Sequence, residues 1–526
     1  MAKKTSSDSK RIIKGVSLSW LKFILTMVIG VVQTPLLFKN LPTVELNTWY
    51  VFFSFGAFLQ ISDLGLVSSI SRIIAYLDNA DPAKKEEKIT AGLKDFSTHQ
   101  IYSTSLLSFS SILFLFGSVA CITYTLLHRS GDPSLNLAFI IFIGGIVFNL
   151  ISNIPTAVLD GYRDVGYDSL VRIVVQVIYF LSLLFLLPVF KSILFVSIAF
   201  LVQNLLQFLA LHFILRIRHR KIFAGPRALK HLIQLSIVKN VYGQSLPLAV
   251  NQIGTWLTSQ GSVLIASIVL GPNKLSDYVI NQQLFSYGIA ISLVINQIIG
   301  PFVAKQHIQE KKENLVSYYR NTVILSLFIV GVFLVALFSS VGNIVDLWVG
   351  PGHFLGYGFA VIFALITFFE VQHSVAGNFV WNMGVWPFNK WTLFAGIINI
   401  GLGFILGKYY GLIGIAMATF ISKILTLNWY VVYYCLKKLG MSIMNYLGTV
   451  FVPMILSVIG SIGLIFFIKQ RIRTAVPNEF IYIVIVSIIS FIVFIGIMLA
   501  LFRKEFKPLF AMARQKLMKA SPAASI

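Results

Sequence analysis

Charged residues are scarce in this sequence. Only 12% of its 526 residues are Asp, Glu, Lys or Arg, whereas 57% are hydrophobic. Soluble globular domains carry roughly 25% charged residues. A water-soluble fold of this length could not bury so large an apolar share. The composition therefore excludes an ordinary soluble protein and predicts that lipid surrounds most of the chain.

Acidic residues and cysteines are especially few. The chain has 19 Asp and Glu against 42 Lys and Arg, which gives a formal net charge of +23. Membrane proteins gather basic residues on their cytoplasmic loops without any ligand, so we expect no nucleic-acid partner. The two cysteines, Cys121 and Cys435, lie in separate apolar runs. They can form neither a disulfide framework nor a Cys-based metal site.

Motifs of membrane enzymes are also missing. The run 403–408 resembles a Walker A loop, but it is one residue short and lacks the Ser or Thr. No H-E-x-x-H motif occurs, and the eight histidines do not cluster as ligands. The first outer loop, 39–47, holds one carboxylate, too few for a metal-dependent glycosyltransferase. These absences indicate a transporter rather than an enzyme, with no metal and no other cofactor.

Apolar runs of about twenty residues recur from one end of the chain to the other. We therefore predict an all-α polytopic membrane protein with about fourteen transmembrane helices. The first run lacks a signal-peptide cleavage pattern and is taken as a retained helix. The predicted helices are 12–38, 48–76, 98–127, 137–161, 165–190, 192–217, 237–268, 276–303, 318–340, 356–382, 389–408, 410–437, 446–468 and 478–503.

The distribution of Lys and Arg predicts the orientation. With the N-terminus inside, roughly 33 of the 42 basic residues fall in the cytoplasm and about 8 outside. The last outer loop, with Lys469, Arg471 and Arg473, is the exception. We predict both termini inside, in a bacterial inner membrane. Segments 227–235 and 504–519 are amphipathic and are expected to lie along the membrane surface.

A short internal repeat suggests a duplication. Leu46–Val51, at the start of the second helix, resembles Leu275–Val279 at the start of the eighth, roughly 228 residues later. A spacing of six helices keeps the orientation, so we expect two parallel six-helix lobes related by an axis along the membrane normal. The predicted parts are an N-lobe at 1–217, a cytoplasmic linker at 218–236, a C-lobe at 237–437, helices thirteen and fourteen at 438–503, and a basic tail at 504–526.

Ionisable residues inside predicted helices are the first candidates for a site, since a charge at the bilayer centre costs at least about 2.5–3.5 kcal/mol. In the first half, Lys22 and Asp63 lie at similar depth. This fits either an ion pair that holds helices one and two together, or a cavity cation, Lys22, whose charge is partly offset by Asp63. In the second half, Glu370 and Lys423 both fall near the midplane, and His373 is one turn from Glu370. This trio fits a structural pair or a proton-carrying group.

Helices seven and eight carry many uncharged polar residues, which are expensive against lipid and suit a wet interior. We also expect Pro155 and Pro247 to bend their helices.

The runs Thr34–Leu41, Asn47–Tyr50 and Asp63–Leu66, followed by Arg72, resemble the opening of polysaccharide flippases. These are the Wzx-type oligosaccharide-lipid transporters of the multidrug/oligosaccharidyl-lipid/polysaccharide exporter (MOP) superfamily. The similar segment 270–278 in the second half and the later Pro301 fit the same family. Fourteen helices argue against its twelve-helix multidrug exporters.

The resemblance implies two lobes around a cavity, with two extra helices that in the related lipid II flippase form a groove for the lipid tail. The implied cargo is an undecaprenyl-pyrophosphate-linked oligosaccharide, flipped to the periplasmic leaflet for O-antigen, capsule or another surface polymer. The implied partners are membrane lipids and the polymerase and chain-length proteins of the pathway. The pyrophosphate would need cations, for which the candidates are Lys22, Arg72, Arg172 and Lys423. Sugars would suit Asn251, Gln252, Trp256, Tyr278, Asn281 and Gln282.

The driving ion stays open between H⁺ and Na⁺. Glu370 and His373 are the proton candidates, and Asp63 is a coupling or structural acid. A cation-coupled exporter of small molecules is the main alternative function and would want a net acidic cavity. A membrane glycosyltransferase or acyltransferase is the third.

Overall fold

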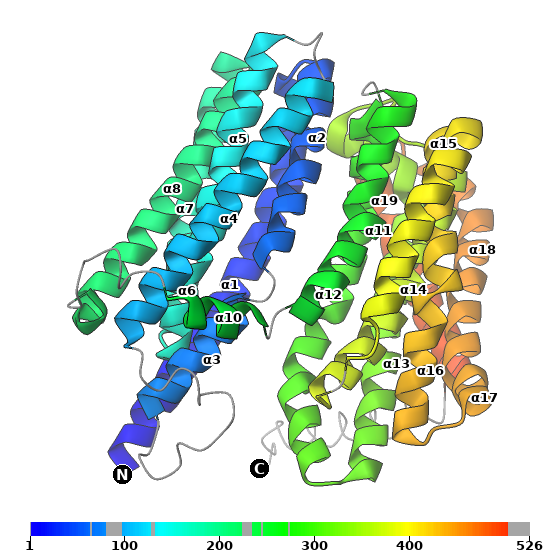
Figure 1. The fold of residues 1–526 in the computed structure, drawn as a ribbon. Helices are drawn as coiled ribbons and strands as arrows, with labels where there is room; N and C mark the ends of the chain where they lie inside the picture. The colour runs from blue at the N-terminus through cyan, green and yellow to red at the C-terminus, as the bar shows by residue number, and fades with distance from the viewer. Residues whose placement is uncertain are drawn as a thin grey trace, which may run out of the picture. The chain divides into compact units, whose positions relative to one another are not determined.

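The computed structural model describes residues 2–63, 66–79, 97–127, 132–223, 234–243, 246–271, 274–384 and 386–502, with the backbone alone for 2–16. The described chain is helical throughout, without strands (Figure 1). In its first part the elements are α1 (Ala2–Asn40), α2 (Thr43–Gln60), η1 (Ile61–Asp63), α3 (Leu66–Asn79), α4 (Thr98–Leu127), α5 (Pro133–Ile151), α6 (Asn153–Gly161), α7 (Val165–Phe190), α8 (Ile193–Arg218), η3 (Arg220–Phe223), α10 (Leu235–Gly243) and α11 (Leu246–Leu270).

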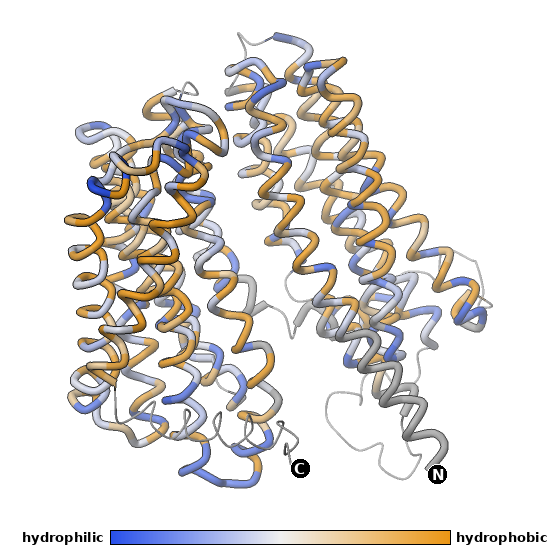
Figure 2. The backbone as a smooth tube through the Cα atoms, turned by 180° about the vertical axis from the view of Figure 1, so that it is seen from behind, coloured by the Kyte–Doolittle hydropathy of each residue, from blue (hydrophilic) through white to orange (hydrophobic). Residues whose placement is uncertain are grey.

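The second part begins with long helices. It contains α12 (Leu275–Ile308), α13 (Lys312–Val349), α14 (Tyr357–Asn382), α15 (Asn389–Leu425), α16 (Leu427–Leu439), α17 (Ile443–Tyr446), η5 (Leu447–Phe451), α18 (Val452–Ala475) and α19 (Glu479–Leu501). Figure 2 shows hydrophobic residues along most of the length of these helices, with hydrophilic residues gathered toward many of their ends.

Within the described residues, 12 helical stretches are long and apolar enough to cross a membrane. The chain is therefore a multi-pass membrane protein, and the predicted all-α class is confirmed. The count differs from fourteen for two reasons. Residues 389–439 form one stretch of 51 residues, which spans two predicted helices. The predicted helix 48–76 is split into α2 of 18 residues, η1 and α3 of 14 residues, and neither α2 nor α3 is both long and apolar enough to count.

Several predicted boundaries were wrong. The helix predicted at 137–161 ends at Ile151 and restarts at Asn153, because Pro155 has no N–H to bond the Ile151 carbonyl. The expected bend at Pro155 is thus present. Pro247 lies in α11 close to residues outside the described ranges, and the bend expected there stays a prediction.

Two more outcomes concern the second part. The predicted break between the helices 389–408 and 410–437 is present within α15 as a kink at Gly411 (φ 62°, ψ −142°), a conformation that glycine adopts without a Cβ penalty. The predicted outer loop after residue 468 is still helical as far as Ala475. Nζ of its Lys469 lies over the ring of Phe466 at 4.4 Å and donates to the Tyr357 hydroxyl over 3.3 Å. Segments 227–233 and 504–519 lie outside the described residues.

Contacts divide the chain into two units. Unit 1 comprises residues 1–276 and 392–408, and unit 2 comprises residues 277–391 and 409–526. The sequence assigned α11 to the C-lobe, but in the structure it packs on α2 and η1 of unit 1. The predicted lobes, with their linker at 218–236, stay a prediction.

Unit 1 is a bundle built on two helix pairs. α1 packs along α7, and α5 packs along α8 (Figure 1). Its apolar core is aromatic: Trp49 and Phe52 are almost fully buried, and the ring of Phe142 contacts both at 5.2 and 5.6 Å. Rings in such edge-on and tilted contacts add to the energy of area burial.

The connection between α6 and α7 is closed by an ion cluster. Arg218 at the end of α8 donates from Nε to Oδ2 of Asp164 over 3.0 Å, and His219 bonds the same oxygen over 3.1 Å. Burial disfavours the charged carboxylate, but the hydrogen bonds from His219 and Arg218 outweigh it and hold the pKa of Asp164 below its ordinary value. The cluster fixes the last turn of α8 against the start of α7.

α11 and the first half of α15 approach each other unusually closely. A Cβ on Gly254 would lie 2.4 Å from the backbone carbonyl carbon of Thr392. Polar contacts reinforce the pair, since Thr392 donates to Oδ1 of Asn251 over 2.9 Å and Asn399 donates to the Leu257 carbonyl over 2.9 Å. Small residues that admit close backbone contact, joined by interhelical hydrogen bonds, are typical of membrane helix pairs.

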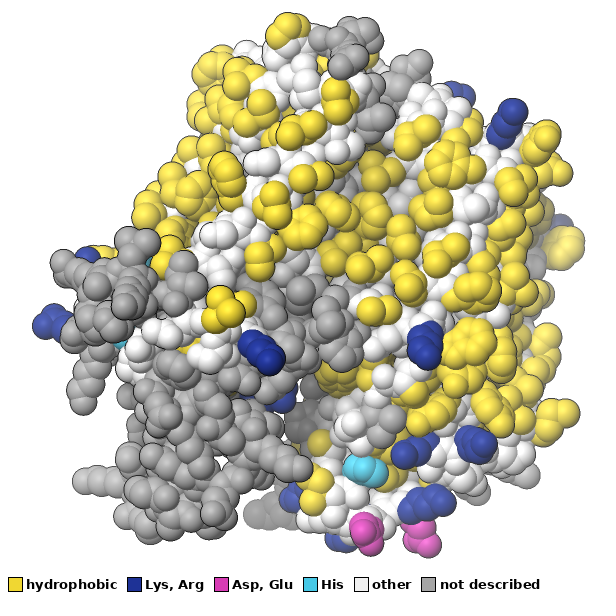
Figure 3. All heavy atoms as spheres, in the orientation of Figure 1, with side chains coloured by type: hydrophobic (Ala, Val, Ile, Leu, Met, Phe, Trp, Pro, Cys, Tyr) yellow, Lys and Arg dark blue, Asp and Glu magenta, His cyan; other side chains and the backbone are white. Residues whose placement is uncertain are grey.

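Unit 2 packs α13 against α14, α18 and α19, and α14 against α16. Ser339 and Ser490 join α13 to α19 by a hydroxyl contact of 3.1 Å. In Figure 3 hydrophobic side chains cover much of the described face of this unit, and charged side chains gather at the lower end, where α12 turns into α13.

Equivalent helix pairs recur along the chain. The α1–α7 and α5–α8 pairs of the first half correspond to α11–α15 and α14–α16 in the second, when the helices are counted six apart. Polar side chains bridge the two helices of the α1–α7 pair and of the α11–α15 pair. This recurrence agrees with the duplicated architecture that the sequence suggested.

The close α11–α15 contact makes a stability prediction. Gly254→Ala should cost about 1–3 kcal/mol, because the new methyl group would force the Thr392 backbone away. Gly401→Ala is the matched control, since nothing lies within 4 Å of its Cβ position and alanine favours helix. Thermal unfolding of purified protein in detergent measures both. Equal midpoints for the two variants would contradict the packing.

Candidate functional site

Unit 1 contains a polar cavity of about 390 Å³. Five elements supply its walls: α2, η1, α5, α6 and α11. Polar side chains are expensive inside an apolar bundle unless they face water or one another, so their convergence marks a wet interior. The lining residues are Ala57, Gln60, Ile61, Asp63, Asn149, Leu150, Asn153, Gln252, Thr255, Trp256, Ser259 and Gln260.

The break between α5 and α6 positions two of the lining amides. Asn149 donates to Oδ1 of Asn204 on α8 over 2.7 Å, which fixes its orientation. Ser152, at the break, donates to the Asn149 carbonyl and accepts from Gln207. Asn153 opens α6 one turn further on, so that both amides line the same cavity.

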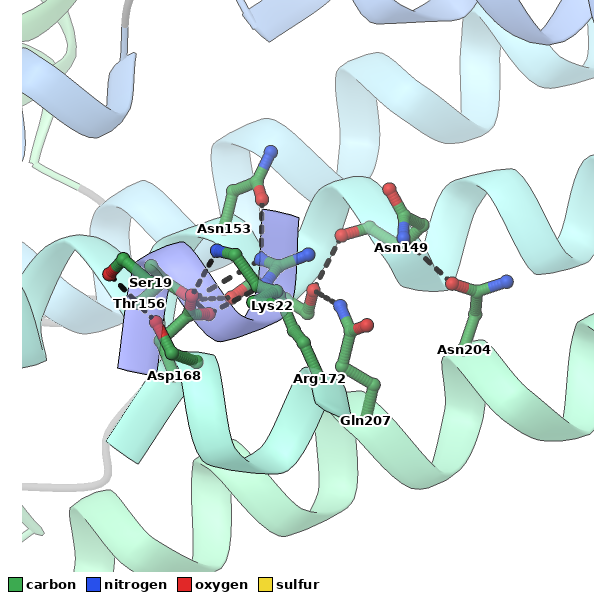
Figure 4. A network of polar contacts seen from close by, with 11 residues as sticks. Ser19, Lys22, Asn149, Asn153, Thr156, Asp168, Arg172, Asn204 and Gln207 are labelled. Carbon is green, nitrogen blue, oxygen red and sulfur yellow. Dashed lines mark hydrogen bonds and ion pairs between the residues drawn. The ribbon is translucent and has the colours of Figure 1, made fainter. Parts of the chain in front are cut away.

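A cluster of charged side chains lies beside this cavity (Figure 4). Oδ1 of Asp168, in the first turn of α7, accepts from Nε of Arg172 over 2.7 Å and from Thr156 over 2.8 Å. Oδ2 of the same carboxylate faces Nζ of Lys22 on α1 at 3.4 Å. Arg172 also donates from Nη2 to Oδ1 of Asn153 over 3.2 Å. Because Asn153 lines the cavity, the cluster adjoins it directly.

The members of the cluster are unequally buried. The side chain of Asp168 is 8% exposed, whereas Arg172 is 21% and Lys22 is 31% exposed. Two cations thus share one well-buried carboxylate and keep part of their surface accessible. Asp160 on α6 adds a second carboxylate nearby, and its Oδ1 is buried without a hydrogen bond within the described residues.

The predicted pairing of Lys22 with Asp63 was wrong. Lys22 pairs with Asp168, because α1 packs along α7 and makes little contact with α2, its neighbour in sequence. A tight outer turn joins α1 to α2 without placing their faces together. The sequence analysis did not single out Asp168.

Asp63 instead lines the cavity. The backbone N–H of Val67, in the first turn of α3, bonds its carboxylate. Oδ1 of Asp63 is buried and has no hydrogen-bond partner among the described residues. Asp63 is also the one charged side chain among the twelve that line the cavity.

Two of the predicted sugar-binding residues, Gln252 and Trp256, line the cavity. The indole N–H of Trp256 donates to the Ser54 carbonyl over 3.2 Å, and its ring lies 5.3 Å from that of Phe58. The ring is therefore held in place by α2. Asn251 does not line the cavity, and its side chain bonds Thr392 instead.

The other predicted sugar-binding residues belong to unit 2 and are not part of this cavity. Tyr278 is fully buried against the rings of Phe359 and Phe363. Asn281 donates to the His353 carbonyl over 2.8 Å and so holds the segment after α13. Gln282 is half-buried on α12.

The predicted second-half trio is confirmed as a geometric group in unit 2. Nζ of Lys423 lies 2.9 Å from Oε2 of Glu370, and Nδ1 of His373 lies 3.7 Å from Oε1. Whether it carries protons stays a prediction. Arg72 is exposed on α3 and does not line the cavity.

Sequence reasoning missed Gln60, Asn149, Asn153 and Asp168. One signal was available: Asn149 and Asn153 are four residues apart, hence on one helix face, just before Pro155. Asp168 had no such signal, because only the α1–α7 packing brings it to Lys22. Within the described residues, no group of three or more His, Cys, Asp or Glu is placed to hold a metal ion.

The shared carboxylate predicts unequal effects of mutation. Asp168→Ala should approach the ~3–5 kcal/mol loss of a broken buried ion pair, because it leaves Arg172 and Lys22 without their counter-charge. Lys22→Ala should cost no more than about 1 kcal/mol, since Arg172 still neutralises Asp168. Thermal unfolding of the purified variants measures the difference. A larger loss for Lys22→Ala would refute this assignment.

No protein-family model matches the chain, and no curated protein matches it in sequence. Solved structures do match. The lipid II flippase MurJ in its inward closed conformation has a TM-score of 0.65 and 16% identity, over 94% of this chain and 100% of that one. An inward-facing MATE-family multidrug resistance transporter of the MOP superfamily has a TM-score of 0.59 and 13% identity, over 82% and 98%.

A third similar structure is a MOP superfamily transporter from Pyrococcus furiosus, described as having a binding pocket of reverse polarity. It has a TM-score of 0.52 and 13% identity, over 82% of this chain and 96% of that one. All three similar proteins are transporters or flippases. The chain has the fold that the MurJ flippase and the MATE transporters of the MOP superfamily share.

Proposed function

We propose that this chain is a flippase of the polysaccharide-transporter type within the MOP superfamily. It carries an undecaprenyl-pyrophosphate-linked oligosaccharide from the cytoplasmic to the periplasmic leaflet by alternating access. One observation carries the proposal: a polar wall, lined mainly by amides and hydroxyls, and a pair of cations adjoin each other inside one apolar bundle. We place the protein in the bacterial inner membrane with both termini inside.

The cation pair supports an anionic head group. A pyrophosphate is a strong hydrogen-bond acceptor, and Arg recognises phosphates through its planar fork while Lys acts as a point charge. Asp168 uses Nε of Arg172 and one face of Lys22, which orients both cations while leaving them partly exposed. A phosphate arriving at the cavity would find donors already in position.

The cavity walls support a glycan. Side-chain amides of Gln60, Asn149, Gln252 and Gln260 supply both donors and acceptors, as sugar hydroxyls require. Trp256 adds a large apolar surface beside them. The prenyl chain needs no protein cavity, because it is as apolar as the bilayer.

The comparisons support a flippase more than a multidrug exporter. The lipid II flippase aligns with 94% of this chain and the MATE transporter with 82%, and the flippase also has the higher TM-score. The fold of the flippase therefore accounts for more of the sequence.

A cation-coupled exporter of small molecules is the second candidate. It is favoured by one observation: among the described residues that line the cavity, Asp63 alone carries a charged side chain. In either case Glu370 and His373 are our candidates for coupling transport to a proton gradient, with a sodium gradient as the alternative. For a flippase, the polymerase and chain-length proteins of O-antigen or capsule assembly are the expected partners.

Complementation of a flippase-null strain tests the cation pair. Lys22→Arg should restore surface glycan, because it keeps the charge, whereas Lys22→Ala and Lys22→Glu should not. Arg172→Lys should fail or restore little, since lysine cannot bond Asp168 and Asn153 at once as the guanidinium does. Glycan is quantified at equal protein levels in the membrane.

Arg216→Ala is the matched control, because Arg216 is an exposed cation of α8 away from the cavity. It should complement like the wild type. Full complementation by Lys22→Ala and Arg172→Ala together would contradict the proposed role of the pair.

A further inference from the structure

The cavity lining carries information about the sugar as well as about the class of cargo. We propose that the Asp63 carboxylate and the Trp256 indole make this cavity selective for an uncharged sugar, such as a hexose or an N-acetylhexosamine, and that they reject a hexuronic acid. The proposal rests on the proposed function and deepens it, since it concerns the sugar next to the pyrophosphate.

The first support is the unsatisfied acceptor. An ionised carboxylate can only accept hydrogen bonds, and a buried acceptor without a donor costs about 1–3 kcal/mol. Within the described chain, Oδ1 of Asp63 has no donor, although the residue lines a polar cavity. Sugar hydroxyls are donors and would satisfy it. A second carboxylate, as in a uronic acid, would be repelled.

Asp63 also has a structural role, which the selectivity does not replace. Its bond to the Val67 N–H places the carboxylate at the N-terminus of α3, where negative charge is stabilised. This bond explains why an acidic residue occurs there. Oδ1 has no hydrogen bond of its own within the described chain and is buried in the wall of the cavity.

The second support is the fixed indole of Trp256. Its N–H is already bonded to the Ser54 carbonyl, and Phe58 holds the ring edge-on. Trp256 therefore offers the cavity an aromatic surface rather than a hydrogen-bond donor. Aromatic faces pack on the C–H faces of pyranose rings, which are apolar. A preset ring loses little entropy on binding.

The size of the cavity and its amides complete the subsite. Its volume of about 390 Å³ is near the lower end of the ~300–1,000 Å³ of small-molecule sites, which suits a sugar ring rather than a whole repeat unit. Gln252 and Gln260 lie on α11 with Trp256, and Asn149 faces them from α5. Arg172, through Asn153, places the pyrophosphate at the adjoining wall.

The test measures binding to the full chain in lipid nanodiscs. The probes are three short-chain prenyl pyrophosphates: one without a sugar, one linked to N-acetylglucosamine and one linked to glucuronic acid. The wild type should bind the N-acetylglucosamine probe about tenfold more tightly than either other probe, which corresponds to about 1.4 kcal/mol.

Asp63→Asn should bring the affinity for the glucuronic-acid probe to within about threefold of that for the N-acetylglucosamine probe. Asparagine is also a good helix cap, so this variant removes the charge and keeps the cap. Asp132→Asn is the matched control. Asp132 caps α5 by accepting from the Ser134 N–H over 2.9 Å, outside the cavity, and its loss of charge should leave the preference unchanged. Trp256→Leu should remove the extra affinity that N-acetylglucosamine gives the probe and leave the affinity for the bare probe unchanged.

The outcomes separate the two proposals. If the wild type binds none of the three probes, the proposed function is wrong. If it binds the bare probe but gains nothing from N-acetylglucosamine, or binds both sugars equally, the selectivity is wrong and the function stands. An unchanged preference in folded Asp63→Asn overturns the role of Asp63, and the wild-type ratios decide the proposal even if that variant does not fold.

Discussion

The ion cluster around Asp168 is the constraint on which the rest of unit 1 depends. Charges inside an apolar bundle are expensive, so two cations on α1 and α7 require a carboxylate within reach. Asp168 provides it, and Thr156 of α6 provides a further donor. The cluster therefore fixes three helices, and the bond from Arg172 to Asn153 extends this order to the cavity wall. Figure 4 shows that the ion cluster and Asn153, which lines the cavity, belong to one network of polar contacts.

How much of this could be read from the sequence depends on the range of each interaction. Helix class, the bend at Pro155 and the group of Glu370, His373 and Lys423 follow from hydrophobic run length, proline chemistry and depth counting, which are local. The partner of Lys22 does not, because it depends on which helices pack. α1 lies along α7, so chain proximity favoured Asp63 and the true partner is Asp168. The placement of α11 with α2 depends in the same way on packing between distant segments.

The cavity then explains why the carboxylate of Asp63 and the cations Arg172 and Lys22 occur in unit 1 without pairing with one another. Arg172 and Lys22 lie against Asp168 at one wall, and Asp63 lies in the lining itself, where it caps α3. A cargo with an anionic head and a neutral, hydroxyl-rich body matches this separation of charge. A small lipophilic cation would match only Asp63. This separation of charge is the basis on which we propose a lipid-linked glycan as cargo.

Transport of such a lipid is the central claim, and a reconstituted assay tests it most directly. Purified protein would be placed in vesicles containing a fluorescent prenyl-pyrophosphate-linked N-acetylglucosamine, and a membrane-impermeant quencher would report how fast the lipid exchanges between leaflets. The account predicts exchange that requires the protein and fails for the same fluorophore on an ordinary phospholipid. Exchange no faster than in empty vesicles, with uptake of a lipophilic cation instead, would contradict it and identify an exporter.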